Sequence, residues 1–190
     1  HAVQDQAIKV NTSTGKVTKL VDFGEMFPDY KASTGHSGID ESDPAASGRW
    51  DWIHFNTIQL LPDGQYYIYM FDNDFGYAMT RPDFDWTMID GISTAQSSKD
   101  ENSNSQFRKY LVDENAGTYT EVQDFDVPYS PYVSSAQELS DDLNLVDIGM
   151  QGLFGVYDDD GNLKAQYKMV LSSGYIYRVY QYGFRGFYFA

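Results

Sequence analysis

The sequence lacks cysteine, and only three of its 190 residues are histidine. Disulfide bridges, thiolate metal sites and cysteine nucleophiles are therefore excluded. Basic residues are also scarce, because 13 Lys and Arg stand against 28 Asp and Glu, a formal net charge of −15. A nucleic acid or an anionic membrane surface requires a positive footprint, so neither is an expected partner. No hydrophobic run approaches the roughly 18 residues of a membrane-spanning helix.

Aromatic residues, in contrast, are plentiful: the chain holds 16 Tyr, 12 Phe and 3 Trp, and 42% of its residues are hydrophobic. This content can fill a core, so wholesale disorder is excluded. A length of 190 residues is typical of one domain, or at most two small ones. We therefore treat residues 1–190 as a single domain.

Short apolar and aromatic runs alternate with turn residues along the chain, and this pattern predicts an all-β fold. The segments Pro62 to Gly64, Glu114 to Gly117 and Asp158 to Gly161 are typical of tight hairpin turns. Residues 134–145 indicate strand, turn and strand rather than a helix, and residues 175–180 indicate a last strand. Four hairpins are expected, with strands at 7–10 and 16–21, 54–61 and 65–71, 107–112 and 118–125, and 153–157 and 163–170.

The hairpins repeat, since the turn glycines Gly117 and Gly161 stand 44 residues apart in the sequence. That spacing is typical of a four-stranded propeller blade. The chain supplies roughly two such sheets plus a piece at each end, whereas a closed propeller needs about four to eight blades. We therefore predict an arc of about two to three antiparallel blades, with a β-sandwich or barrel as the alternative. Residues 83–105, rich in Ser, Asp, Asn and Gln, are expected to form a surface insertion loop.

The main candidate for chemistry is His54, at the start of an expected strand. Strand alternation puts Trp52, His54 and Asn56 on one face. A histidine beside an asparagine can act as a nucleophile with a hydrogen-bonding partner that orients it. A half-buried histidine that fixes a strand end fits the same spacing, and both interpretations remain open here.

Other candidate sites are weaker. Arg178, in the tyrosine-rich tail, can hold a sulfate or carboxylate with two hydrogen bonds, and it can equally stack on a tyrosine or form a surface ion pair. The acidic segments Asp72 to Asp74 and Asp158 to Asn162 offer oxygens to Ca²⁺, but acidic turns of this kind are usually solvated, and the second segment lacks EF-hand spacing. Nucleotide-binding and phosphate-binding motifs are absent from the sequence, and no metal or cofactor is predicted.

Several segments, taken in order, resemble bacterial arylsulfate sulfotransferases, the PAPS-independent arylsulfotransferases. Asp51 to Ile58 is similar to a motif of that family with the pattern Asp-Trp-(Ile/Leu)-His-x-Asn-(Ser/Thr). The remaining similar segments are Leu61 to Gln65, Met70 to Asn73, Ser105 to Asp113, Tyr129 to Gln137 and Tyr175 to Val179. The resemblance covers roughly residues 51–182 and matches the C-terminal part of the family's propeller.

The resemblance implies a six-bladed propeller enzyme that bacteria export to the periplasm, the cell surface or the medium. In that family a neutral histidine attacks an aryl sulfate, forms a sulfohistidine and passes the sulfuryl group to a phenol. His54 matches the motif histidine and Asn56 its companion, so these two are the expected catalytic residues. Trp52 and Arg178 are expected to bind substrate, and Arg178 is not assigned a catalytic role.

This chain is shorter than the family, and the family's other histidines and its arginine lie upstream of the matched segments. We therefore expect the C-terminal portion of a larger propeller that has no turnover alone. A partner chain or self-association is expected to cover its open sheet faces. A second hypothesis is a non-catalytic extracellular binding module for a glycan or a protein. A glycosidase with an acidic pair is a third and weaker one.

Overall fold

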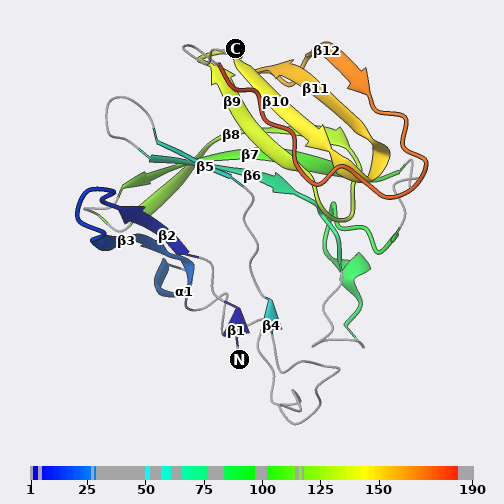
Figure 1. Cartoon of the computed structure of the whole chain (residues 1–190). Helices are drawn as coiled ribbons and strands as arrows, with labels where there is room; N and C mark the ends of the chain where they lie inside the picture. Colours follow the sequence, from blue (N-terminus) through cyan, green and yellow to red (C-terminus); the bar gives the residue numbers. More distant parts are fainter. Residues whose placement is uncertain are drawn as a thin grey trace.

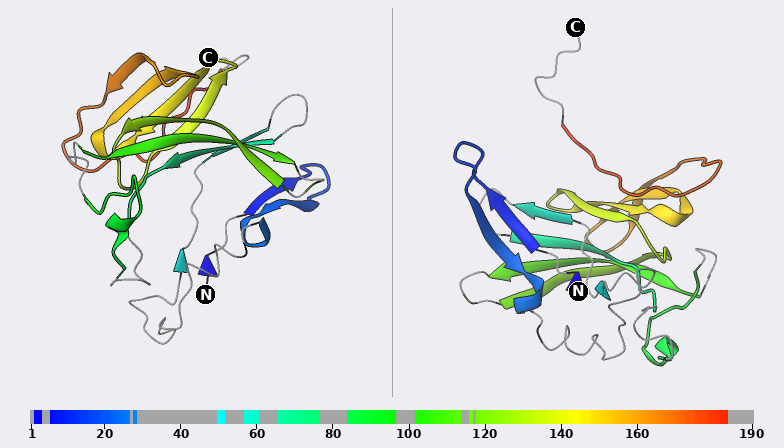
Figure 2. Two further views of the ribbon diagram at one scale, coloured as in Figure 1. Left: turned by 180° about the vertical axis from the view of Figure 1, so that it is seen from behind. Right: turned by 60° about the horizontal axis from the view of Figure 1, so that its bottom comes forward.

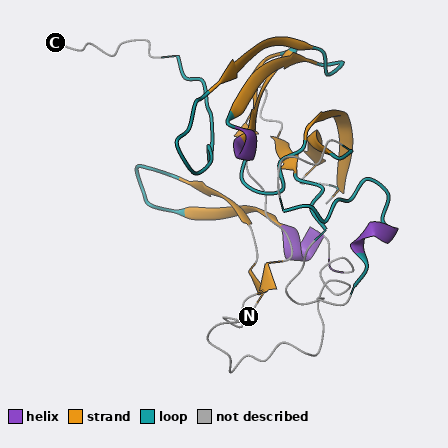
Figure 3. Ribbon diagram, turned by 90° about the vertical axis from the view of Figure 1, so that its right-hand side faces the viewer, coloured by secondary structure: helices purple, strands orange, loops and turns teal. Residues whose placement is uncertain are grey.

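The computed structural model describes residues 2–3, 6–26, 28, 50–51, 57–60, 66–76, 84–96, 102–113, 116 and 118–183. Strands dominate this part of the chain (Figure 3). Helical structure within it is confined to the single turn α1 (Phe23–Met26) and the 3-10 turns η1 (Trp86–Met88) and η2 (Gly149–Gln151). The expected all-β class is confirmed.

Two four-stranded antiparallel sheets form the body of the molecule (Figure 1). In each sheet, every strand pairs with the next one along the chain. The first sheet contains β5 (Thr57–Leu60), β6 (Tyr66–Asp72), β7 (Asn104–Asp113) and β8 (Thr118–Pro128). The second sheet contains β9 (Ser135–Ser140), β10 (Leu143–Ile148), β11 (Leu153–Asp158) and β12 (Leu163–Lys168). Residues 134–145 thus form a strand, a turn and a strand, as predicted.

A shorter hairpin precedes the two sheets. Its strands β2 (Gln6–Val10) and β3 (Val17–Asp22) pair antiparallel, and β1 (Ala2–Val3) pairs in parallel with β4 (Trp50–Asp51). The hairpin packs on one face of the first sheet, and the second sheet lies on the other (Figure 2). Two full sheets preceded by a smaller piece match the predicted arrangement. These open sheets are consistent with successive propeller blades or with a sandwich.

The main core fills the space between the two sheets. Phe107 and Phe125 face each other across β7 and β8, and their rings stack with centroids 4.6 Å apart. Phe125 also stacks on Tyr157 of β11, with ring centroids 5.5 Å apart. Because strand side chains alternate between faces, these aromatic positions turn inward together. A smaller core joins the hairpin to the first sheet and contains Ala7, Val21, Phe23, Ile68 and Val112.

Acidic residues form the hydrogen bonds that hold the turn between β11 and β12. Gly161 has φ +76°, and its N–H donates to the Asp158 carbonyl at 3.0 Å. The Asp158 carboxylate accepts the N–H of Asp160 and of Asn162 at 3.1 and 2.7 Å, and it pairs with Lys164 at 2.6 Å. The acidic residues therefore build a hairpin turn. No group of acidic or histidine side chains in the described part of the chain is arranged to hold a metal ion.

One expected strand is absent. Residues 175–180 carry no backbone ladder, and residues 169–183 instead cross one face of the second sheet as irregular chain, red at its end in Figure 1. The β-branched and aromatic residues favour an extended backbone, but a strand also needs a paired neighbour, which the described residues do not supply. We call residues 175–183 the strap. The turn at Pro62 to Gly64 lies outside the described residues, and the end of the expected insertion, Asn104 and Ser105, belongs to β7.

Candidate functional site

The predicted site residues Trp52, His54 and Asn56 lie outside the described residues, so their roles stay predictions. The chain on either side of them is described. β4 ends at Asp51, and β5 begins at Thr57 opposite Tyr69 of β6. Because β5 and β6 are antiparallel, the chain enters β5 at the same end of the first sheet where β6 ends.

At that end of the sheet, small polar side chains form a buried network, which we call the serine junction (Asn73, Ser105, Ser130 and Ser134). The Ser105 hydroxyl accepts the N–H of Ser130 at 2.9 Å and donates to the carbonyl of Asn73 at 3.1 Å. The side-chain amide of Asn73 donates to the carbonyl of Ser130 at 2.6 Å. The Ser134 hydroxyl donates to that of Ser130 at 3.0 Å. All three serines are at most 1% exposed.

The serine junction connects the two sheets. The hydroxyls of Ser130 and Ser134 accept the N–H groups of Met150 and Gly149 at 3.2 and 3.0 Å, which fixes η2 of the second sheet. Three of the segments that carry the family resemblance therefore meet here. Sequence reasoning missed this role, because serines are usually exposed and their partners are distant in the chain. A buried hydroxyl must find partners, so these positions are structural connectors.

Between the sheets lies a paired cation. The ammonium of Lys109 is 2.7 Å from the Glu138 carboxylate and 4.5 Å from the ring centroid of Tyr67. The hydroxyl of Tyr69 also donates to Glu138. Burial and the hydrogen bond to the charged Glu138 raise the pKa of Tyr69 well above its usual range. The positive charge of Lys109 is thus balanced by the carboxylate of Glu138.

Arg108 is paired as well. Its guanidinium lies 3.0 Å from the carboxylate of Asp72 and 2.8 Å from that of Glu121. Burial lowers the pKa of Arg108, but the hydrogen bond that Arg108 donates to Glu121 and the charge of Asp72 outweigh it, so the net shift is upward. Asp72 thus accepts from Arg108, and Asn73 donates to the serine junction, so both have structural partners.

Arg178 lies exposed on the strap. Its guanidinium carbon is 4.9 Å from the ring centroid of Tyr177, and Nη2 donates to the Tyr177 hydroxyl at 3.4 Å. This is the cation–π arrangement considered as the alternative in the sequence analysis. Tyr175, Tyr177 and Tyr182 are each more than half exposed, at 55%, 54% and 64%. A substrate-binding role for Arg178 stays a prediction.

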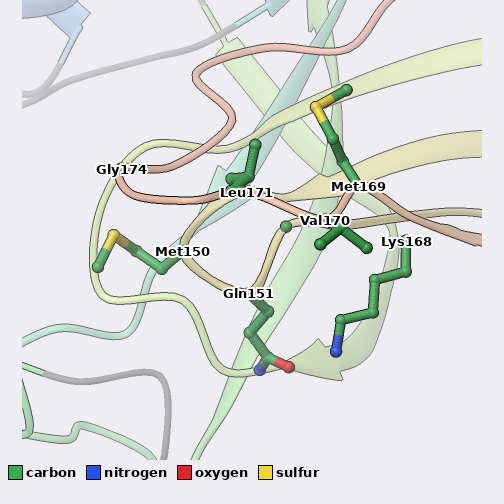
Figure 4. A pocket seen from close by; sticks show the side chains of 8 residues that line it. Met150, Gln151, Lys168, Met169, Val170, Leu171 and Gly174 are labelled. Carbon is green, nitrogen blue, oxygen red and sulfur yellow. The ribbon is translucent and has the colours of Figure 1, made fainter.

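A shallow hollow of about 270 Å³ opens where β12 leads toward the strap (Figure 4). Met150, Met169 and Leu171 give it apolar walls, and Lys168 and Gln151 are its polar side chains. Its lining holds no histidine and no carboxylate, so it can take an apolar group. No helix in the described ranges is long and apolar enough to cross a membrane.

Of three comparisons with known proteins, one found a match. A family model described as Arylsulfotransferase (ASST) matches residues 1–65 and 57–178. The match thus extends the resemblance upstream to the N-terminal hairpin and includes the segment with His54. A search of curated proteins and a search of solved structures each returned no match. Since the model matches most of the sequence, the chain belongs to the arylsulfotransferase family.

Proposed function

We propose that this protein transfers a sulfuryl group from an aryl sulfate to a phenolic acceptor through a sulfohistidine at His54. The observation that carries the proposal is the family match, which covers the segment with His54 and continues through the serine junction to residue 178. Donor and acceptor classes follow from the family. Export to the periplasm or the cell surface of a bacterium is part of the proposal.

The chemistry needs two displacements at sulfur. In the first, the free nitrogen lone pair of neutral His54 forms an N–S bond while the S–O bond to the aryl group breaks. The electron pair leaves with the phenolate, which takes a proton from solvent. In the second, the oxygen of an acceptor phenol forms an S–O bond while the N–S bond breaks. The electron pair of that bond returns to the imidazole nitrogen, which restores neutral His54, and the phenol proton passes to solvent. Asn56 orients the imidazole, and Trp52 contacts the aryl ring.

The sulfuryl oxygens gain negative charge during each step, so the site needs cations that are free to bind them. Among the described residues, Lys109 and Arg108 are already paired with carboxylates, and Arg178 lies on the exposed strap. We infer that residues 1–190 have no turnover alone. Cations from a further segment or from a partner chain would complete the site.

The test uses 4-nitrophenyl sulfate as donor and phenol as acceptor, on the natural full-length protein and on residues 1–190. The full-length protein should release nitrophenol, and donor alone should add one sulfuryl group to its intact mass. His54→Asn should abolish both signals, whereas His36→Asn should leave both unchanged. Transfer by the His54 variant at the wild-type rate would overturn the proposal. Turnover by residues 1–190 would overturn only the inference of inactivity.

A second candidate function is a non-catalytic extracellular binding module for a glycan or a protein. The observation that favours it is exposed aromatic and apolar surface: the strap tyrosines, and Ile8, Val10 and Val17 on the hairpin, which are 54%, 49% and 57% exposed. Exposed faces of this kind mark contact surfaces for a partner chain or a second copy. This function would be favoured if the protein showed no sulfuryl transfer but bound a glycan array, or associated with a second copy, and if the His54→Asn variant bound equally well.

A further inference from the structure

The second sheet contains a carboxyl group with no partner. Asp147 of β10 is 0% exposed, and neither of its side-chain oxygens accepts or donates a hydrogen bond. It lies opposite Ser135 of β9 and Phe154 of β11, so all three side chains share one face of the sheet. Buried polar groups almost always have partners, and this exception requires an explanation.

The strap covers that face. The Ser135 hydroxyl accepts the N–H of Val179 at 3.1 Å and donates to its carbonyl at 3.3 Å. Two residues further on, the side-chain amide of Gln137 accepts the N–H of Gln181 at 2.8 Å and donates to its carbonyl at 3.0 Å. The strap is therefore held by side chains of β9 rather than by a backbone ladder. Such an attachment can open without breaking the sheet.

A third attachment lies nearby, where the N–H of Ile176 donates to the carbonyl of Gly149 at 3.1 Å. Gly149 follows β10 directly, two residues after Asp147. Ile176 is only 8% exposed, whereas both of its neighbours are more than half exposed. The strap thus buries the Ile176 side chain over the end of β10.

Among the described residues, no charged group lies beside Asp147. Its nearest neighbours on that face are Ser135 and Gln137 of β9, Phe154 and Val156 of β11, and Ala165 and Tyr167 of β12. Asp158 lies on the same face at the far end of β11, opposite Leu143, and is paired with Lys164. The strap contributes tyrosines and one charge within its described residues, Arg178, which is exposed and held by Tyr177. Burial alone raises the pKa of Asp147, to about 7.

We propose that Asp147 is a proton-controlled latch, which keeps the strap docked on the second sheet when protonated and releases it when ionised. An ionised carboxylate without partners is costly in this apolar space. When the strap lifts, water reaches the Asp147 carboxylate while the sheet stays intact. The released face offers Ser135, Gln137 and the apolar surface of β10 and β11 to another β-layer. This inference does not depend on sulfuryl transfer.

The sign of the effect follows from proton linkage. With the strap open, a hydrated aspartate has a pKa near 4, and with the strap closed the pKa is about 7. The closed form therefore binds more protons between these values. Docking is tightest below about pH 4, weakens as the pH rises to about 7, and levels off above that.

Hydrogen–deuterium exchange of the strap tests the proposal between pH 5 and pH 8.5, with rates corrected against an unstructured peptide. Protection of the amides of Ile176, Val179 and Gln181 should fall about tenfold per pH unit up to pH 7, and then stay constant. Asp147→Asn, which cannot ionise, should keep the strap protected at every pH. Asp141→Asn removes an exposed carboxylate from the turn between β9 and β10, and it should retain the wild-type slope.

Constant protection in the wild type, or an unchanged slope in Asp147→Asn, would overturn the latch. Should Asp147→Asn fail to fold, Gln137→Ala replaces it. That variant loses two strap bonds, so its protection should fall by one common factor at every pH while the slope remains. A slope that disappears in Gln137→Ala would show that another group controls the strap, and would equally overturn the proposal.

Discussion

The two faces of the second sheet are buried in different ways. The inner face packs aromatic rings against the first sheet, and the charged pair there, Lys109 and Glu138, is complete. The outer face lies under the strap and buries the unpartnered Asp147. The contact on the inner face is therefore costly to open, because opening it exposes a large apolar core to water. The outer contact consists of four side-chain hydrogen bonds, one backbone hydrogen bond from Ile176 to Gly149 and the buried side chain of Ile176, so it should cost much less to open.

The largest expected effect is on the inner face. Phe107 is 0% exposed and stacks on Phe125, so Phe107→Ala leaves a cavity between the sheets. The free energy of unfolding should fall by about 3–5 kcal/mol, measured by urea denaturation. Phe154→Ala on the outer face is the matched control, since its half-buried ring stacks only on Tyr167, and it should cost about 1 kcal/mol. Equal losses for the two variants would contradict the distinction between the faces.

The next effect concerns the inner charge pair. Glu138→Gln leaves the Lys109 ammonium buried without a counter-charge, because the two side chains are only 14% and 10% exposed. Breaking such a pair should lower the free energy of unfolding by about 3 kcal/mol. The double variant Lys109→Met with Glu138→Gln should recover part of the loss. A loss below about 1 kcal/mol in the single variant would show that Lys109 reaches solvent instead.

Contact between strap and sheet is tested at Gly149. A Cβ atom there would lie 2.1 Å from the carbonyl oxygen of Ile176, so Gly149→Ala must push the strap away. We expect a loss of about 1–3 kcal/mol and faster amide exchange in the strap at every pH. Gly174 has φ +86° but open space around it, so Gly174→Ala should strain only its own turn. Strap exchange that is unchanged in Gly149→Ala would contradict the docked position.

The contrast between local pairing within the sheets and distant contacts with the strap explains which features could be predicted from the sequence. Hairpins are local, so alternating residues and turn glycines predicted the strands of both sheets. The 44-residue spacing also recurs in the structure, because Ser135 binds Val179 and Gln137 binds Gln181. The strap residues that contact β9 therefore lie one 44-residue interval further along the chain. The strap fails to form the expected strand because its side of the ladder has no partner among the described residues.

Long-range polar contacts could not be predicted. The Ser105 hydroxyl meets Ser130 across 25 residues, and Asn73 meets it across 57. Asp147 follows Leu143 and Leu145 at a spacing of two, but nothing in that pattern shows that the strap will cover it. The family resemblance drew attention to these segments as motifs. Their role in joining the sheets emerged only from the contacts.

The smallest expected effect is at Asp158, a partly buried carboxyl of the second sheet whose pKa moves in the opposite direction to that of Asp147. Hydrogen bonds from Lys164 and Asn162 lower the pKa of Asp158 to about 2.

The lowered pKa of Asp158 stabilises the folded state above about pH 4, which is the pKa of an aspartate in the unfolded chain. This stability is lost as the pH falls from about 4 to 2. Asp158→Asn should therefore lower the melting temperature at pH 7 only slightly, because Lys164 is half exposed and solvent screens the pair. It should reduce the loss of melting temperature between pH 4 and pH 2, in a titration followed by circular dichroism. Asp147→Asn should leave that acid range unchanged and should remove the pH dependence between pH 4 and pH 7. If Asp158→Asn alters the melting temperature mainly above pH 5, the two carboxyl groups do not titrate independently, and the outer face and the hairpin turn must be treated as one unit.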